Sequence, residues 1–274
     1  DHDRDSAGMR YVYPVLSRRA GGISVGINLN PNNACNWRCI YCQVPGLTRG
    51  GPPPIDLGLL ENELTALLDR IQAGRFLGHV ADGAQPSRQL VDVAFSGNGE
   101  PTSAAEFPAA VAIAQRVLAA RGLDNRVKLR LITNGSLLDR PPVRAGIARL
   151  GQAGGEVWFK LDAATPAGLV KINGTRANPR AIARRLSHCA TLATTWVQSC
   201  FFLLDHQPPP EAEVDAYLTL LAPLAERLAG VHLYSLARPS LQPEAPRLRR
   251  MRLSDLERIA QRIRQLGLNT RINP

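Results

Sequence analysis

Residues 90–134 read LVDVAFSGNGEPTSAAEFPAAVAIAQRVLAARGLDNRVKLRLITN and alternate between two kinds of pattern. The runs 90–97 and 127–134 are short, rich in Val, Leu, Ile and Phe, and end at Gly or Asn, as buried strands do. Between them, residues 104–120 repeat apolar side chains at three- and four-residue spacing, which predicts a helix. This stretch therefore predicts a strand–helix–strand unit with parallel strands.

The same alternation continues in both directions along the chain. It predicts further strands at 23–30, 156–163, 195–205 and 231–238, and further helices at 57–68, 142–150, 179–192, 211–228 and 254–266. Ser254, followed three residues later by Glu257, predicts a capping box for the last helix. Six alternating units predict an α/β fold with a parallel sheet, either open and doubly wound or a barrel. Their near-regular spacing favours an incomplete (βα)6 TIM-like barrel, because eight units need roughly 250 residues plus extensions.

The chain shows no sign of division into several domains. Its proline-rich stretches stand where predicted strands join predicted helices, so they are interpreted as loops. We expect one domain over residues 23–274, with a short C-terminal helix and tail, preceded by an N-terminal extension over 1–22. The sequence has no apolar run of about 18 residues, so no membrane segment is expected. Its charged N-terminus is unlike a secretory signal.

Composition and charge set broad limits on function. The 274 residues are 45% hydrophobic and 20% charged, which excludes a disordered chain and provides for a sizeable core. Lys and Arg number 33 against 23 Asp and Glu, a net charge of +10 that is typical of proteins binding nucleic acid or acidic substrates. Only Lys128, Lys160 and Lys171 are lysines, so an arginine-rich composition is the alternative source of the charge.

Three of the five cysteines, Cys35, Cys39 and Cys42, fall within eight residues, a spacing that indicates a metal site in a reducing, cytoplasmic compartment. Three thiolates spaced in this way can bind three irons of a [4Fe–4S] cluster and leave the fourth iron open. A structural zinc site is the alternative, although zinc normally takes four closed ligands. Cys189, Cys200 or a distant His would then have to supply the fourth. Both of these cysteines are more simply interpreted as small buried apolar residues.

The cysteine spacing, with Tyr41 directly before the last cysteine, resembles the radical S-adenosylmethionine superfamily. The resemblance implies that the open iron binds the amino and carboxylate groups of S-adenosylmethionine. It also implies that one electron from the cluster cleaves this cofactor to methionine and a 5′-deoxyadenosyl radical, which abstracts a hydrogen atom from a substrate. We expect a separate electron donor of the flavodoxin or ferredoxin type, because no flavin-binding domain precedes the cysteines.

The glycine–glutamate motif of that superfamily has a counterpart after the strand at 90–97. The residues there that the resemblance places on the cofactor are Ser96, Gly97, Asn98, Gly99 and Glu100. Glycines let the backbone approach a ligand closely, and a carboxylate beside backbone acceptors suits the cofactor's ammonium group.

Four further cofactor residues are implied by the same resemblance, and the first of them is Tyr41, between Cys39 and Cys42. Asn134 follows the next strand, and Lys160 and Asp162 end the one after it. A lysine suits the methionyl carboxylate, and an acceptor suits the ribose hydroxyls. All these residues, with the cysteines, stand at the carboxyl ends of successive strands, where parallel α/β sheets place their sites.

Within the superfamily, the sequence is most similar to the branch of wyosine-base synthases and their uncharacterised bacterial relatives. The shared stretches are FSGNGEPT (95–102), TNGSLL (133–138), KLDAAT (160–165), Ile172-Asn173 and YSLARP (234–239), and the resemblance covers about residues 24–240. The Arg-Pro that follows Ile-Asn in this branch is here Gly174-Thr175-Arg176. Wyosine synthesis itself is not expected, because two remaining cysteines are too few for its second cluster.

Arg176, His206 and Arg238 follow predicted strands and are candidates for substrate contact, although each also suits a surface loop. The basic run 246–252 either tracks phosphates or is a solvated loop. The first hypothesis, supported by the branch resemblance and the net charge of +10, is a radical enzyme that modifies RNA, in particular tRNA. The alternatives are a radical enzyme on a small molecule or peptide, glycyl-radical activation included, and a non-enzymatic metal-binding module.

Overall fold

The computed structural model describes residues 8–17, 22–75 and 89–273. Its centre is an eight-stranded sheet in the order β1-β2-β5-β6-β7-β8-β10-β12. These strands are β1 (Val12–Ser17), β2 (Gly22–Ile27), β5 (Leu90–Phe95), β6 (Lys128–Thr133), β7 (Glu156–Lys160), β8 (Thr194–Cys200), β10 (Gly230–Tyr234) and β12 (Thr270–Asn273). Strand β1 is antiparallel to β2, and the other neighbours in this sheet are parallel. The six predicted strands are present in chain order, which confirms the α/β class.

The sheet curves without closing. Strands β1 and β12 stand at the two ends of the strand order, and the described residues contain no pairing between them. This confirms the prediction of an incomplete barrel. All the parallel strands end at the same edge of the sheet, so the loops that follow them are gathered there.

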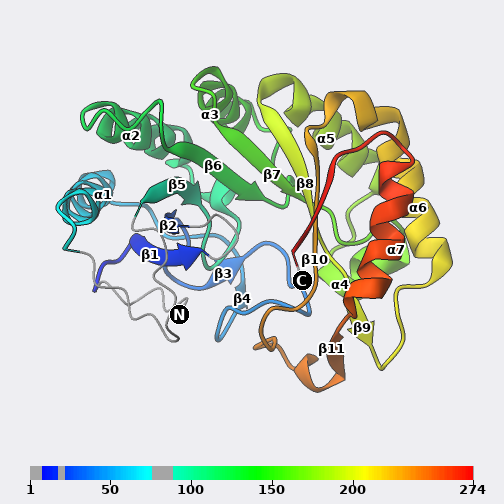
Figure 1. Ribbon diagram of the computed structural model, residues 1–274. Coiled ribbons are helices and arrows are strands. Elements are labelled where there is room, and N and C mark those ends of the chain that lie inside the picture. Colours follow the sequence, from blue (N-terminus) through cyan, green and yellow to red (C-terminus); the bar gives the residue numbers. More distant parts are fainter. Residues whose placement is uncertain (1–7, 18–21, 76–88, 274) are drawn as a thin grey trace.

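Helices cover the outer, convex side of the curved sheet (Figure 1). They are α1 (Leu57–Gln72), α2 (Phe107–Ala119), α3 (Pro141–Gln152), α5 (Pro179–Leu192), α6 (Glu211–Leu221) and α7 (Leu253–Arg264), with a short α4 (Pro166–Asn173) after β7. Alternate strand residues point outward into this layer. Val93, Leu131 and Phe159 are fully buried there, and each such side chain contributes about 1.5–3 kcal/mol to stability. No described helix is both long enough and apolar enough to span a membrane.

The inner face of the sheet carries a stack of cationic and aromatic side chains toward the amino ends of the strands. The guanidinium of Arg130 lies 4.9 Å from the ring of Trp158, and that ring lies 4.6 Å from His232. His232 is also 4.6 Å from Trp196, over which Arg271 lies at 4.4 Å. The stack fills the barrel interior in the way that side chains fill closed barrels. This stack of side chains lies beneath the loops at the carboxyl ends of the strands.

Edge strand β1 lies within the N-terminal extension expected over residues 1–22 and was not among the predicted strands. Its Tyr13 ring crosses the neighbouring strand at Gly26, where a Cβ atom would lie 2.1 Å from the Tyr13 Cζ atom. The position therefore requires glycine. The Tyr13 hydroxyl reaches the Oγ of Ser96 at 3.0 Å, so this strand touches the loop after β5.

The predicted strand 195–205 is wrong in its second half. Strand β8 ends at Cys200, and the chain continues as β9 (Phe202–Leu204), which pairs antiparallel with β11 (Leu248–Arg250). Phe201 packs edge-on against Tyr217 in the outer core, whereas Phe202 lies 5.7 Å from the ring of Tyr41. From Phe202 onward the backbone pairs with β11 instead of with the neighbours of β8, which ends β8 at Cys200.

Two helix predictions also need correction. The predicted helix 211–228 ends as an α-helix at Leu221 and continues as a 3-10 segment, η2 (Ala222–Arg227), because Pro223 cannot donate the next helical hydrogen bond. The capping box at Ser254 is wrong, since α7 begins at Leu253 and its N-cap, Arg252, makes no side-chain cap. The side chain of Arg252 pairs with Asp255 at 2.8 Å instead. Helix α4 was not predicted.

Candidate active site

The three clustered cysteines lie on the loop that follows β2, across the carboxyl ends of the strands. Its two-residue strands β3 (Ala34–Cys35) and β4 (Thr48–Arg49) pair with each other and close the loop. Cys35, Cys39 and Cys42 are each partly exposed on this loop. Burial raises the pKa of Cys35 to about 11 and that of Cys39 to about 12. Both thiols are therefore neutral near pH 7 in this structure.

The end of α4 holds one side of this cysteine loop. The backbone N–H of Arg38 donates to the carbonyl of Asn173 at 3.1 Å, and that of Ile40 donates to Ile172 at 2.9 Å. Gly174 then turns the chain away with a φ of 59°, a left-handed conformation that favours glycine. A Cβ atom at Gly174 would also lie 2.7 Å from the Arg38 carbonyl oxygen. Both the backbone conformation and this close approach therefore require glycine.

The loop after β10 holds the other side of the cysteine loop. The hydroxyl of Ser240 donates to the carbonyl of Ile40 at 2.7 Å, and the side-chain amide of Gln242 donates to that of Val44 at 3.0 Å. The cysteine loop is therefore clamped between segments that follow β7 and β10. This clamp fixes the three thiols relative to the ends of the strands.

The Gly97–Glu100 turn packs directly against the cysteine loop. A Cβ atom on Gly99 would lie 2.1 Å from the carbonyl oxygen of Ala34, and one on Gly97 would lie 2.4 Å from Oδ1 of Asn28. The Asn28 oxygen accepts hydrogen bonds from the backbone of Asn98 at 3.1 Å. The predicted glycines thus bring two backbone segments into contact beside Cys35.

Glu100 is buried, with 2% of its surface exposed. Its Oε1 accepts from the backbone and hydroxyl of Thr102 at 3.1 and 2.6 Å and from the hydroxyl of Thr133 at 2.6 Å. Its Oε2 accepts from the backbone of Asn134 at 2.7 Å. Burial raises the pKa of Glu100, and these hydrogen bonds partly offset the rise. The carboxylate therefore ties its own turn to the end of β6, with Oε2 the less occupied oxygen.

Asn134 links the end of β6 to the cysteine loop. Its Nδ2 donates to Oδ1 of Asn36 at 2.9 Å, and its Oδ1 accepts from the backbone and hydroxyl of Ser136 at 3.0 and 2.6 Å. Asn36 also donates to the Ser136 hydroxyl at 2.7 Å. These three side chains form one closed hydrogen-bonded group next to the cysteines.

Asp162 is the centre of a second group. One oxygen accepts from the hydroxyl of Tyr41 at 2.5 Å and the side-chain amide of Asn173 at 3.0 Å. The other accepts from the backbone of Cys200 at 2.9 Å and lies 3.1 Å from the ammonium of Lys160. A carboxylate offers about four lone-pair positions, so all four are engaged by the protein.

Lys160 lies between two tyrosine rings on the inner face of β7. Its ammonium donates to the Tyr234 hydroxyl at 2.6 Å and lies 4.8 Å from the Tyr234 ring and 5.1 Å from the Tyr41 ring. Burial alone would lower the pKa of Lys160, but the Asp162 carboxylate and Tyr234 raise it above its usual value. Lys160 is therefore a buried cation at neutral pH.

The three candidates for substrate contact, Arg176, His206 and Arg238, do not all lie beside the cysteine loop. Arg238 and Arg176 are exposed in the two segments that clamp the cysteine loop, and the carbonyl of Arg238 accepts from Gln43 at 3.3 Å. His206 is exposed in a tight turn after β9, with a φ of 63°. The first two lie beside the site, whereas His206 belongs to a separate turn.

Four residues in these groups were not predicted as site residues. Asn173 and Tyr234 both lie in motifs that the branch resemblance quoted, so motif membership was the signal that could have found them. Asn36 lies among the cysteines and could have been suspected from its position. Tyr13 carries no comparable signal, because its role depends on an edge strand that pairs only in the folded protein.

Cys189 and Cys200 are buried, at 0% and 2% exposure, as predicted. Cys189 lies on the buried face of α5, and Cys200 ends β8. Among the described residues, no three His, Cys, Asp or Glu side chains are grouped so as to hold a single metal ion.

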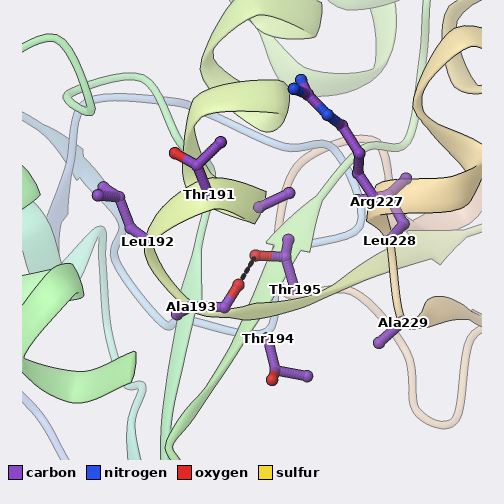
Figure 2. Close-up of a pocket in the computed structure, with 9 residues that line it drawn as sticks. Thr191, Leu192, Ala193, Thr194, Thr195, Arg227, Leu228 and Ala229 are labelled. Carbon is purple, nitrogen blue, oxygen red and sulfur yellow. Dashed lines mark hydrogen bonds between the residues drawn. The ribbon is translucent and has the colours of Figure 1, made fainter. Parts of the chain in front are cut away.

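Figure 2 shows a pocket that lies away from these groups, at the amino end of β8. It is lined by Ala190, Thr191, Leu192, Ala193, Thr194, Thr195, Arg227, Leu228 and Ala229. Arg227 donates to the hydroxyl of Ser187 at 2.7 Å, and Thr195 to the carbonyl of Ala193 at 2.8 Å. None of the predicted site residues lines this pocket.

The residues around the cysteine loop fit the group that the sequence motif implies. Three thiols on one short loop suit a [4Fe–4S] cluster with an open iron. Two buried amide oxygens beside them, Oδ1 of Asn98 and Oδ1 of Asn173, have no hydrogen-bond partner among the described residues. Buried acceptors are normally paired, so these two suit a ligand that brings N–H or O–H donors.

Comparison with known sequences gives short matches. No protein-family model matches the chain. It is 26% identical over 138 residues, half its length, to a protein named GTPase Obg of Brachyspira hyodysenteriae, of which it covers 17%. It is 28% identical over 152 residues, 55% of its length, to a UPF0026 protein of Helicobacter pylori, of which it covers 41%. The chain thus spans less than half of each of these relatives.

Comparison with solved structures gives matches over most of the chain. A radical SAM methyltransferase from Sphaerobacter thermophilus superimposes with a TM-score of 0.60 at 16% identity, covering 96% of this chain and 68% of that one. A structure of TYW1 with a lysine-pyruvate adduct gives a TM-score of 0.57 at 16% identity, covering 90% and 74%. The fold is that of radical S-adenosylmethionine enzymes.

Proposed function

We propose that the protein is a radical S-adenosylmethionine enzyme that holds a [4Fe–4S] cluster on Cys35, Cys39 and Cys42. The observation that carries this proposal is the contact between the cysteine loop and the Gly97–Glu100 turn, which is so close that a Cβ atom added at Gly99 would lie 2.1 Å from the carbonyl oxygen of Ala34. When bound, the cluster and S-adenosylmethionine together supply a 5′-deoxyadenosyl radical that removes a hydrogen atom from a substrate.

The chain's own groups suit the polar parts of that cofactor. The backbone at Gly97 and Gly99, with Oδ1 of Asn98 and the less occupied oxygen of Glu100, offers acceptors to an ammonium group. Lys160 keeps one N–H beyond its contacts with Asp162 and Tyr234 and offers a cation to a carboxylate. In this proposal, Asp162 positions Lys160 and Tyr41 rather than touching the cofactor.

An external electron donor of the flavodoxin or ferredoxin type completes the proposal. The cysteine loop is partly exposed at the edge of the sheet. Its Arg49 donates to the carbonyls of Asn36 and Gly174 and makes no ion pair with a described carboxylate. An exposed cation beside the cluster suits an acidic donor.

The experiment that tests the proposed activity measures cofactor cleavage. Reduced, anaerobically reconstituted protein incubated with S-adenosylmethionine is expected to release 5′-deoxyadenosine and methionine in equal amounts, slowly in the absence of substrate. Chromatography of the quenched reaction measures both products, and protein without reductant is the control. Binding of the cofactor with no 5′-deoxyadenosine over many hours would contradict the proposal.

For the substrate, we propose RNA, and tRNA in particular. The proposal is supported by the sequence resemblance to wyosine-base synthases and by the net charge of +10. In the basic run 246–252, Arg247 and Arg252 pair with Asp205 and Asp255. Arg249 and Arg250 are exposed on β11 and pair with no described carboxylate. Phosphates would meet these two arginines at the same edge of the sheet as the cysteine loop.

Binding of tRNA is expected to weaken steeply with salt, by about one logarithmic unit of slope for each phosphate contacted. The double variant Arg249→Glu, Arg250→Glu should reduce that slope by roughly two and leave basal cofactor cleavage unchanged. Arg70→Glu, Arg126→Glu, an equal charge change at exposed positions remote from the cysteine loop, is the control. Filter-binding titrations at several salt concentrations measure the slopes. Failure of tRNA to bind at low salt, or equal slopes for all three proteins, would favour the alternative of a small-molecule or peptide substrate.

A further inference from the structure

The side chain of Asn173, the last residue of α4, is 1% exposed and lies against a cysteine of the triad. Its Nδ2 is 3.2 Å from the Sγ of Cys39 and 3.0 Å from Oδ2 of Asp162. We infer that the Asn173 amide is a positioning residue that sets the reduction potential of the cluster through Cys39. The inference rests on the proposed function, because it requires that the triad holds an iron–sulfur cluster.

The orientation of the Asn173 amide is determined by its neighbours. An amide nitrogen has two N–H donors, and here one acceptor, a sulfur or a carboxylate oxygen, faces each of them. A flipped amide would place Oδ1 against the Asp162 carboxylate and the Cys39 sulfur, where like partial charges repel. Asp162 is itself held by Tyr41 and Lys160. The donor therefore stays directed at Cys39.

The backbone, and not this side chain, attaches α4 to the cysteine loop. The carbonyl of Asn173 accepts from Arg38, the carbonyl of Ile172 accepts from Ile40, and Gly174 turns the chain immediately afterwards. Replacing the side chain leaves these contacts possible. The amide can therefore be removed while the loop that carries Cys39 stays in place, which makes its contribution measurable.

The expected effect on the cluster has a definite sign. Reduction adds one negative charge to the cluster and its thiolates, and N–H donors to the sulfur stabilise that charge, so they raise the potential. The Sγ of Cys39 accepts a hydrogen bond from the side-chain amide of Asn173 at 3.2 Å. The Sγ of Cys35 accepts one from the backbone N–H of Trp37 at 3.5 Å. Loss of the Asn173 amide should make the cluster harder to reduce.

The test compares reconstituted wild type, Asn173→Ala and Asn178→Ala in redox titrations followed by electron paramagnetic resonance. Asn178 is a matched asparagine five residues on, whose side chain accepts from Arg180 at the start of α5 and touches no thiol. At the wild-type midpoint, Asn173→Ala should show a roughly tenfold lower ratio of reduced to oxidised cluster, equivalent to about 59 mV for one electron. Asn178→Ala should keep the wild-type potential while its thermal stability falls.

A second variant keeps the test decisive if Asn173→Ala does not retain iron. Asn173→Gln preserves an amide donor one methylene further out, so it should retain the cluster at a potential different from that of wild type. The inference is overturned if every Asn173 variant that holds iron has the wild-type potential. Absence of iron and sulfide in reconstituted wild type would instead overturn the proposed function.

Discussion

Replacing any one of Cys35, Cys39 and Cys42 with alanine is expected to abolish the cluster. Wild-type protein reconstituted anaerobically should hold about four iron and four sulfide ions per chain, since a [4Fe–4S] centre contains four of each. The remaining two thiols cannot hold three irons, and the clamped loop offers them no replacement. Iron and sulfide analysis measures the loss, and each triad variant should also release no 5′-deoxyadenosine.

The matched control removes the other two cysteines. Cys189 and Cys200 are buried at 0% and 2% exposure on α5 and β8, outside the cysteine loop. The double variant Cys189→Ala, Cys200→Ala should therefore keep the wild-type content of iron and sulfide. Iron lost in this variant would contradict the assignment of the triad as the complete ligand set. One zinc per chain without sulfide in wild type would favour the structural alternative.

The central strands could be predicted because they are buried on both faces. Segments such as β5 and β10 are nearly continuous apolar runs, and tertiary packing strengthens the preference that their residues already have. The edge strands could not be predicted in the same way. Strand β1 contains Pro14, which is tolerated at an edge, and β12 reads TRIN with a single aliphatic residue. Both are strands only because a neighbouring strand offers its hydrogen bonds.

The loops of the site could be predicted, but most of their internal contacts could not. Motifs placed Gly99, Glu100 and Asp162 correctly at the ends of strands. The four protein donors to Asp162 were not foreseeable, because Tyr41 lies 121 residues away and nothing in the sequence indicates that the pair meets. Likewise, Glu100 looks like a ligand group in isolation, and only its burial shows that it also holds two strand ends together. Helix α4 did carry a signal, Thr165 as N-cap followed by Pro166, but eight residues are too few to show periodicity.

The substitution Gly99→Val is expected to weaken binding of S-adenosylmethionine. The Cβ atom would lie 2.1 Å from the carbonyl oxygen of Ala34 and 2.7 Å from the side chain of Asn30, so the turn and the cysteine loop must move apart. Overpacking of this kind costs about 1–3 kcal/mol, and every 1.4 kcal/mol is a factor of ten in affinity. Affinity should therefore fall by roughly ten- to hundredfold, as measured by anaerobic equilibrium dialysis.

The same substitution at Gly51 separates this effect from a general disturbance of the loop. Gly51 directly follows the cysteine loop, and a Cβ atom there would meet nothing within 4 Å, so Gly51→Val should bind the cofactor as wild type does. Because Ala34 adjoins Cys35, iron content must be measured beside affinity in all three proteins. Weak binding by Gly99→Val at full iron content assigns the turn to the cofactor itself. Wild-type affinity at full iron content would show instead that the cofactor lies elsewhere and that Gly99 serves only the packing of the two loops.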